Sequence, residues 1–363
     1  MGAGPSGSTC AYNLKRFHPA ASVLLIDQAT FPRVKPCGGG ISPDVKNYID
    51  FDISDILNCQ QKKIFLVVNQ QKIAADCDLW MVRREHFDHF LLKKAQERGV
   101  VVKQDCRVTD INNQPSRVVV QTLQGNFTGK IAVIAEGSRG TLAKKLKLTA
   151  KNNITAALEY EHYQENPDVP LHIDFEQTKN GYAWIFPKSD GLSIGIGRFS
   201  SKKNVPELGL PQQLKKYLHD YHITDIDKKQ WHGHPVQLYS GKRKLVYHRI
   251  LLVGEIAGAV DPLIAEGIRP SIKSGFYAAK ILAETIEKNN VRLLRQYDQL
   301  FHQMIGKDFQ YARIAAYLLF RYFNKTMTSI LTHSAAKSFA KVFSGQACYS
   351  DYLTARRLLR MVM

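Results

Sequence analysis

The sequence of 363 residues contains no apolar run long enough to cross a bilayer. The longest candidate, Ile314–Phe320, is bounded by Arg313 and Arg321. We also expect no signal peptide, because the first residues already form a glycine-rich motif. We therefore expect a cytoplasmic protein with no membrane span and no secretory leader.

Cysteine is sparse, and its spacing matches neither a disulfide framework nor a metal site. The six cysteines include no Cys-x-x-Cys pair, and scattered free thiols are typical of a reducing cytoplasm. They are Cys10, Cys37, Cys59, Cys77, Cys106 and Cys348. Histidine offers one close pair, His232 and His234, which we interpret as exposed imidazoles on a strand rather than metal ligands. We expect no metal.

The composition is that of an ordinary globular protein, with 44% hydrophobic and 23% charged residues. The length allows two domains, or one large core with a second lobe. The formal net charge of +18 is large, but the basic residues are spread along the chain and no nucleic-acid-binding motif accompanies them. An anionic membrane surface or a pyrophosphate-bearing substrate fits this charge better than nucleic acid does.

The most informative motif lies at the amino terminus. Gly2, Gly4 and Gly7 form Gly-x-Gly-x-x-Gly, with Pro5 and Ser6 inside it, and a helical stretch follows over residues 8–17. Residues 21–27 then read as a buried parallel strand that ends in Asp27. An acid at this distance reaches the ribose of a dinucleotide whose pyrophosphate lies on the helix amino terminus. The pattern predicts dinucleotide binding.

A Rossmann unit has a strand before its glycines, and this chain has only Met1 there. One explanation is a truncated start. The other is a chain that holds its cofactor less firmly.

Along the chain, α/β segments alternate with strand-rich segments. This interleaving predicts an α/β fold (α+β overall), with a Rossmann-type lobe made of residues 1–50, 80–150 and 246–290. Residues 51–79 and 151–245 form an inserted, mostly antiparallel β substrate lobe. Residues 291–363 read as helical.

Three further segments combine glycine with an acid or a thiol at the end of a strand. The stretch 31–41 places three glycines after Cys37, which predicts a cofactor-facing loop, although a flexible surface loop has the same composition. Glu136 follows the apolar residues 131–135. Glu255 follows the apolar residues 251–253, and a proline turn and a helix over residues 269–288 come next.

Together these turns resemble the glutathione-reductase-type FAD fold of the aromatic-hydroxylase branch. Two segments narrow the match: Cys37-Gly38-Gly39-Gly40-Ile41-Ser42-Pro43 after Phe31-Pro32-Arg33, and Gly181-Tyr182-Ala183-Trp184-Ile185-Phe186-Pro187-Lys188 before Gly195-Ile196-Gly197. They resemble the geranylgeranyl reductase family. The resemblance covers most of residues 1–290. It implies an FAD-dependent oxidoreductase that reduces C=C bonds of a polyprenyl chain in isoprenoid and lipid metabolism, acting on a diphosphate, a lipid or a quinone.

The resemblance also implies roles for individual residues. The cofactor would contact Gly2, Gly4, Pro5, Ser6, Gly7, Asp27, Cys37, Gly38, Gly40, Arg84, Val108, Glu255, Pro262, Gly267 and Ile268. The prenyl chain would contact Tyr182 and Trp184. Three positions depart from the family pattern, which usually has Asp where Glu136 and Glu255 stand and often has Gly where Ala265 stands.

The chemistry needs hydride at one alkene carbon and a proton at the other, in a slot that excludes water. Cys37 is the candidate catalytic residue, as proton donor or cofactor contact, although a thiol there also serves simply as a small packing group. Tyr182 and Trp184 alternate on one strand face, which suits a prenyl pocket and also suits a generic core.

The segment 309–363 mixes aromatic and aliphatic residues with lysine and arginine. It fits a peripheral element that docks on the inner membrane face, and equally a helical cap over the substrate lobe. NADPH, NADH or ferredoxin could each supply electrons, since no second nucleotide motif is visible.

Two other functions stay open. A flavin monooxygenase or halogenase uses the same fold, but a halogenase should carry Trp-x-Trp-x-Ile-Pro, and here Tyr182 replaces the first tryptophan and Phe186 precedes the proline. A degenerate, non-catalytic homologue is the remaining alternative.

Overall fold

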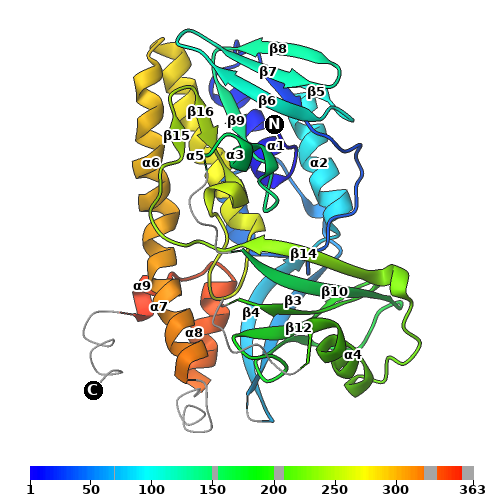
Figure 1. Ribbon diagram of the computed structural model, residues 1–363. Coiled ribbons are helices and arrows are strands. Elements are labelled where there is room, and N and C mark those ends of the chain that lie inside the picture. Colours follow the sequence, from blue (N-terminus) through cyan, green and yellow to red (C-terminus); the bar gives the residue numbers. More distant parts are fainter. Residues whose placement is uncertain (69, 149–153, 200–207, 323–332, 354–363) are drawn as a thin grey trace.

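The computed structural model describes residues 1–68, 70–148, 154–199, 208–322 and 333–353. Its α/β part and its large, mostly antiparallel sheet lie at opposite ends, and a column of helices runs alongside both (Figure 1). The α-helices are α1 Pro5–Phe17, α2 Arg84–Glu97, α3 Thr141–Lys145, α4 Leu210–Asp220, α5 Ile268–Glu287, α6 Gln296–Phe301, α7 Lys307–Tyr322, α8 His333–Phe343 and α9 Tyr349–Tyr352. Short 3₁₀ turns are η1 Pro43–Asn47, η2 Ser54–Ile56, η3 Lys228–Gln230, η4 Gly254–Ala257 and η5 Val291–Arg295, and η6 His302–Gly306 is a π-helical turn that joins α6 to α7.

The strands form four sheets. They are β1 Leu24–Ile26, β2 Gly40–Ile41, β3 Cys59–Val68, β4 Gln71–Met81, β5 Val101–Lys103, β6 Val108–Asn113, β7 Val118–Thr122, β8 Gly125–Gly129, β9 Ala132–Ile134, β10 Ile154–Tyr163, β11 Leu171–Asp174, β12 Gly181–Lys188, β13 Gly191–Arg198, β14 Trp231–Gln237, β15 Val246–Tyr247 and β16 Ile250–Leu252. The orders are β1-β5, β15-β16-β9, β6-β7-β8 and, in the eight-stranded sheet, β14-β10-β13-β12-β11-β3-β4-β2.

Two small parallel pairs flank the glycine motif. β1 pairs with β5, and β9 pairs with β16. Between them, the Met1 nitrogen donates to Val133 O at 2.8 Å, and Met1 O accepts from Ala135 N at 2.8 Å. On the other side, Gly2 N donates to Ile26 O at 2.8 Å. The main chain of two residues thus links β1 to β9 and positions the glycine turn at their carboxyl ends.

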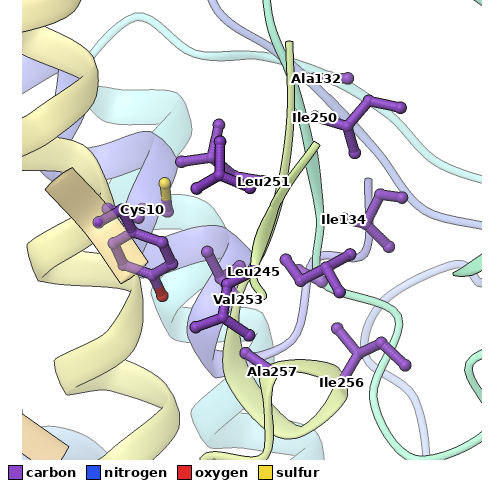
Figure 2. Packing of buried hydrophobic residues seen from close by; sticks show 14 of the residues in the cluster. Cys10, Ala132, Ile134, Leu245, Ile250, Leu251, Val253, Ile256 and Ala257 are labelled. Atoms are coloured by element: carbon purple, nitrogen blue, oxygen red, sulfur yellow. The ribbon is translucent and has the colours of Figure 1, made fainter. Parts of the chain in front are cut away.

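The α/β part has its own core, which lies between the β9–β16 pair and the helices α1 and α5. Side chains from β9, β16 and η4 meet Cys10 of α1 there (Figure 2). Ile134, Leu251, Leu252, Val253 and Ile256 have no exposed surface. Burial of such aliphatic side chains contributes roughly 1.5–3 kcal/mol each and so holds the glycine motif on a rigid base.

The eight-stranded sheet carries different layers on its two faces. Ala183 and Ile185 of β12 point to the face covered by α4, where they pack with Leu214 and Leu218. Tyr182 and Trp184 point to the other face, where α8 packs near β4. The alternation of side chains along β12 therefore assigns the aromatic residues to the face opposite α4.

The predicted fold class is confirmed: the chain combines a glycine-loop α/β part, a mostly antiparallel sheet and a helical carboxyl-terminal region. The strand expected over residues 21–27 is shorter, Leu24–Ile26, and helix α1 starts earlier than expected, at Pro5. Proline suits this position because its missing N–H is not needed in the first helical turn. The division into domains stays a prediction.

Within the carboxyl-terminal segment, α8 covers the substrate-lobe sheet through Ala336, Ala340 and Phe343. This agrees with the expectation of a helical cap, while residues 323–332 and 354–363 of the segment lie outside the described residues. None of the helices in the described residues is long and apolar enough to span a bilayer.

Helix α5 approaches α1 at Gly275, where an added Cβ would lie 2.3 Å from Ser6 O and 3.1 Å from Cys10 N. We predict that Gly275→Val lowers the free energy of unfolding by about 3 kcal/mol or more, since the main chain of α1 cannot move away without disturbing the core. Urea denaturation measures this. Gly129→Val, on the open β8 strand where a Cβ has its nearest neighbour at 3.6 Å, is the control, and equal effects of the two substitutions would contradict the prediction.

Candidate functional site

A single cavity of about 950 Å³ extends from the glycine loop at α1 to the face of the eight-stranded sheet opposite α4. Its walls come mainly from the glycine loop, the loop 33–40, the start of α2, strands of the large sheet and the stretch from Glu255 to Ser271. Residues 26–29 and 106–109 and residues within 134–145 also line it. The volume lies at the upper end of the range for small-molecule and cofactor sites, which is roughly 300–1,000 Å³.

The three glycines of the motif have different structural roles. Gly2 has φ +93°, and a Cβ on it would lie 2.3 Å from Ala135 O, so the turn against β9 requires glycine. A Cβ on Gly7 would lie 1.8 Å from Gly2 O. Gly4 instead lines the cavity, and its Cβ would meet only Arg33 Nη2 at 3.5 Å. A side chain there would fill the space in front of the helix.

The amino end of α1 is open to an anionic ligand. No side chain caps the helix, and no acidic residue lies in its first turn. The first amides of a helix have no partner within it, and they carry the positive end of the helix dipole. Asp27 lies beside this turn, where Oδ2 accepts from Ala3 N at 2.6 Å and Oδ1 accepts from Ala29 N at 2.8 Å. These contacts orient its carboxylate at the cavity wall.

The glycine loop after Cys37 is packed against the molecule. Gly39 has φ +78°, and a Cβ on it would lie 2.1 Å from Val82 O. A Cβ on Gly38 would lie 2.5 Å from the ring of Phe186. The loop therefore depends on close approach, and the interpretation as a flexible surface loop is wrong. Cys37, Gly38 and Gly40 all line the cavity.

Arg84 is fixed by a fully buried carboxylate. Its Nε and Nη2 donate to the two oxygens of Asp88 at 2.9 and 2.8 Å, and Arg33 reaches the same carboxylate at 3.0 Å. Burial alone lowers the pKa of Arg84, but Asp88 and Cys37 outweigh it, so the net shift is upward and the guanidinium keeps its charge. A bidentate pair of this kind holds the arginine head rigidly at the cavity wall.

Lys35 and His234 meet on the cavity wall and interact through Lys35 Nζ and the imidazole ring. Ser138 Oγ lies 3.2 Å from His234 Nε2. Burial lowers the pKa of Lys35 to about 8, and burial together with Lys35 lowers the pKa of His234 to about 3. The prediction of a strand at His232 and His234 is confirmed. The prediction that both imidazoles are exposed is wrong, because both residues are half-buried on the cavity wall and His234 lies against Lys35.

The carboxylates of Glu136 and Glu255 each accept hydrogen bonds from neighbouring main-chain amides. Glu136 accepts from Leu142 N at 2.9 Å and Ala143 N at 2.7 Å, and so caps the short helix α3. Glu255 Oε1 accepts from Gln237 N at 2.9 Å, and burial raises the pKa of this carboxyl. Both glutamates line the cavity while they bond to neighbouring main chain.

The far wall of the cavity is aromatic. Tyr182, Trp184 and Phe186 stand in line on β12, and Tyr182 donates to Ile264 O. The indole of Trp184 lies across Gly195 of β13, where a Cβ would meet ring carbons at 2.0 to 2.5 Å. Phe199 and Phe343 also line this wall. The arrangement makes an apolar slot that continues from the glycine loop.

The structure brings most of the predicted site residues to this one cavity. Those that line it are Gly2, Gly4, Pro5, Ser6, Asp27, Cys37, Gly38, Gly40, Arg84, Val108, Tyr182, Trp184, Glu255, Gly267 and Ile268. Gly7 and Pro262 do not line it: Gly7 packs beneath Gly2, and Pro262 is buried in the turn before α5. The roles predicted for these residues stay predictions.

Several cavity residues were missed by sequence reasoning. The charged ones are Arg33, Lys35, Glu159, Glu266, Arg107, Arg139 and Lys145. Lys35 could have been found from its place inside the Cys37 loop. Glu159 gives no local signal, because an acid in an alternating strand reads as a solvent-facing position. Among the described residues, no group of three or more His, Cys, Asp or Glu side chains could hold a metal ion.

No protein-family profile matches the chain. Three relatives are similar in sequence over most of their length. An uncharacterized protein of Methanosarcina barkeri is 28% identical over 79% of this chain and 74% of its own. A menaquinone reductase of Mycobacterium tuberculosis is 26% identical over 88% of this chain and 83% of its own. A digeranylgeranylglycerophospholipid reductase of Methanococcus vannielii is 26% identical over 86% and 85%.

Solved structures share the fold. A geranylgeranyl bacteriochlorophyll reductase-like protein from Thermoplasma acidophilum superposes with a TM-score of 0.78 at 20% identity, over 99% of this chain and 93% of its own. The resemblance to the geranylgeranyl reductase family is confirmed. A flavin-dependent brominase also matches, with a TM-score of 0.73 at 19% identity over 99% and 96%. A halogenase variant in complex with FAD matches with a TM-score of 0.71 at 14% identity over 96% and 86%. The chain therefore has a flavoprotein fold, and those of its relatives that have functional names are reductases.

Ala265 has φ +52°, a left-handed conformation that favours glycine, and glycine is the residue that the resemblance implies at this position. We predict that Ala265→Gly raises the free energy of unfolding by roughly 0.5–1 kcal/mol, because relief of the left-handed strain exceeds the added entropy of the unfolded chain.

Chemical denaturation tests this prediction. Ala259→Gly is the matched control, since Ala259 is fully buried and does not have a positive φ. The control should lose stability. A loss of stability in both variants would show that Ala265 is not strained.

Proposed function

We propose that this chain is an FAD-dependent oxidoreductase that reduces C=C bonds of a polyprenyl chain. The observation that carries the proposal is the continuity of the cavity. One space joins a dinucleotide-type glycine loop with Asp27 to a slot lined by Tyr182 and Trp184, with Cys37 at the junction loop. A cofactor at the loop would therefore share its space with an apolar substrate at the sheet.

The residues present fit FAD. The uncapped amino end of α1 and the bare Gly4 provide a place for a pyrophosphate, and Asp27 suits a ribose hydroxyl. Val108 lines the cavity with Asp27, and Arg84, Cys37 and Gly267 line it with Trp184. When bound and reduced, the flavin would supply hydride. The protein would orient the alkene, exclude water and hold the proton for the second carbon.

The substrate follows from the shape and lining of the slot. An unactivated alkene carries no polar group for recognition, so binding must come from apolar contact, and the aromatic wall provides it. Relatives with functional names are a menaquinone reductase and digeranylgeranylglycerophospholipid reductases. We propose a prenyl lipid, a prenyl quinone or a prenyl diphosphate as substrate, NADPH or NADH or else ferredoxin as electron donor, and delivery from an anionic membrane surface.

Halogenation is the second candidate, and the similarity to the brominase and the halogenase favours it. Those two structures are less than 20% identical to this chain in sequence, so they support the fold alone. The named sequence relatives are reductases at 26% identity. We therefore treat halogenation and oxygenation as alternative reactions that the test below can detect.

The test is a visible spectrum of the purified chain after reconstitution with FAD. The flavin is reduced without oxygen, and geranylgeranyl diphosphate is then added. Return of the oxidised spectrum on adding the prenyl substrate is the expected result. A flavin that reoxidises only with oxygen would favour a monooxygenase or halogenase. Failure to bind flavin would indicate the degenerate homologue.

A substitution at Gly4 separates the cofactor site from the fold. Gly4 has φ −71° and ψ −174°, an extended conformation that valine also adopts, and its Cβ would make only an ordinary van der Waals contact, with Arg33 Nη2 at 3.5 Å. We predict that Gly4→Val leaves the melting temperature of the flavin-free chain unchanged and lowers FAD affinity at least tenfold, measured by fluorescence titration. Gly129→Val is the control for affinity. Normal FAD binding by Gly4→Val would contradict the assignment of the pyrophosphate to this loop.

A further inference from the structure

One carboxylate on the cavity wall contacts neither the glycine loop nor the loop 33–40. Glu159 of β10 is 3% exposed and lines the cavity on the same wall as Trp184. The strand register explains its position. Glu159 is opposite His232 of β14 on one side and opposite Gly195 of β13 on the other, and Gly195 is opposite Trp184. Residues in register share a face, so Glu159 and Trp184 face the slot from one row of the sheet.

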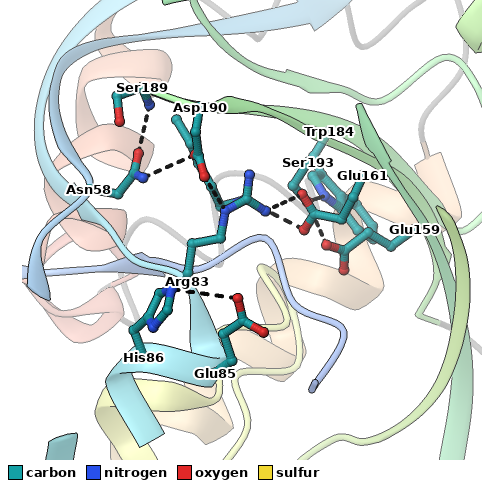
Figure 3. Close-up of polar contacts among 11 residues, drawn as sticks. Asn58, Arg83, Glu85, His86, Glu159, Glu161, Trp184, Ser189, Asp190 and Ser193 are labelled. Atoms are coloured by element: carbon teal, nitrogen blue, oxygen red, sulfur yellow. Dashed lines mark hydrogen bonds and ion pairs between the residues drawn. The ribbon is translucent and has the colours of Figure 1, made fainter. Parts of the chain in front are cut away.

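Glu159 belongs to a network of hydrogen bonds within the sheet (Figure 3). Ser193 Oγ donates to Glu159 Oε1 at 2.8 Å and accepts from Trp184 Nε1 at 3.3 Å. The side chain of Glu161, two residues along the same strand, also hydrogen-bonds to Glu159. The carboxyl group is therefore held at a fixed place beside the indole that forms the slot.

The network continues to the surface. Arg83 Nη1 donates to Glu161 Oε2 at 2.6 Å, and Arg83 Nε donates to Asp190 Oδ2 at 2.9 Å. Side-chain exposure rises from 14% at Glu161 to 49% at Asp190. Lys188 Nζ lies 3.7 Å from Glu161 Oε1. Glu161 is thus within reach of solvent protons, while Glu159 faces the slot.

The charges in this network balance only when Glu159 is neutral. Arg83 and Lys188 bring two positive charges, and Glu161 and Asp190 bring two negative charges. An ionised Glu159 would add a buried negative charge with no cation of its own.

The groups that face Glu159 are Glu161 on its own strand, Ser193 on β13, Trp184 and Lys188 on β12, and His232 on β14. Burial and the bond with Glu161 raise the pKa of Glu159. Burial alone would raise the pKa of Glu161 too, but Lys188 and Arg83 outweigh it and the net shift is downward. Two carboxyl groups that share a site divide in this way, so that one holds the proton.

We propose that Glu159 is the catalytic acid of this site, a carboxylic acid stored in the cavity wall that gives its proton to the substrate double bond. The inference rests on the proposed prenyl reduction. The π bond of the alkene opens, one carbon gains a hydride with both electrons from the reduced flavin, and the other carbon gains the proton from the Glu159 carboxyl. The alkene is reduced by two electrons and the flavin is oxidised by two. The Glu159 carboxylate regains a proton from solvent through Glu161.

The first test concerns the stored proton and needs no turnover. If Glu159 is neutral in the folded chain, the unfolded chain releases this proton at a lower pH, near 4.3, than the folded chain does. The folded state then binds more protons above this pH, so stability falls as pH rises toward the raised pKa. Glu159→Gln lacks this dependence. We expect wild type to lose stability relative to Glu159→Gln from about pH 5 upward, measured by urea denaturation.

The same substitution at the exposed Glu165 is the matched control, and it should change no slope. If the difference in stability between wild type and Glu159→Gln does not change between pH 5 and 8, Glu159 is not a proton store and the inference fails.

The second test is a single turnover of the FAD-loaded chain with geranylgeranyl diphosphate in the absence of oxygen. Glu159→Gln should slow the return of oxidised flavin by about 10²–10⁴-fold, the usual contribution of a general acid. Its FAD content, its reduction by dithionite and its reoxidation by oxygen should match wild type and Glu165→Gln. Wild-type rates in Glu159→Gln would overturn the inference and leave the proposed function intact. If wild type itself does not react with the prenyl substrate, the proposed function fails, and the stability test still decides whether Glu159 stores a proton.

Discussion

The site depends on how closely the main chain approaches the amino end of α1. Gly2 turns against Ala135, Gly275 of α5 packs on Ser6, and Gly254 has φ +72° with no room for a Cβ beside the Ser6 side chain. Ala135 therefore approaches the glycine turn closely, and η4 and α5 approach the first turn of α1 closely. This packing points the free amides of α1 toward the cavity. Gly4, which has no side chain, leaves the space in front of these amides open to a ligand.

The second requirement is a sheet that presents its side chains on two faces. Alternation along β12 sends Ala183 and Ile185 to the core under α4 and sends Tyr182 and Trp184 to the cavity. Alternation along β10 places Glu159 and Glu161 beside that aromatic row. Gly195 makes this possible, because only a residue without a side chain lets the indole of Trp184 lie flat across β13. The slot and its acid come from the same register.

Sequence reasoning was most successful where function leaves a local pattern. Gly2, Gly4 and Gly7 with Asp27 predicted the loop, its helix and its place beside the cavity, because spacing alone decides such a turn. The resemblance also implied that Cys37, Arg84 and Trp184 belong to the site, and all three line the same cavity. The roles of these residues stay predictions.

Contacts that depend on the register between strands distant in the sequence could not be predicted from the sequence. Glu159, Ser193 and Arg83 lie far apart in the chain, and nothing near any of them marks a buried network. His234 reads as an exposed strand residue until the loop that carries Lys35 is placed against it. The carboxylate of Glu136 accepts from two main-chain amides at the amino end of α3, a contact that the residues around Glu136 did not predict.

The central claim is that a cofactor at the glycine loop reduces an alkene held at the aromatic wall. The most direct measurement is product analysis by mass spectrometry after anaerobic incubation of the reduced, FAD-loaded chain with geranylgeranyl diphosphate in D₂O. We expect a product that has gained two deuterium atoms for each double bond removed, because the flavin hydride and the acid proton both exchange with solvent. Recovery of unchanged substrate in D₂O, or of an oxygenated or halogenated product when air and halide are admitted, would contradict it.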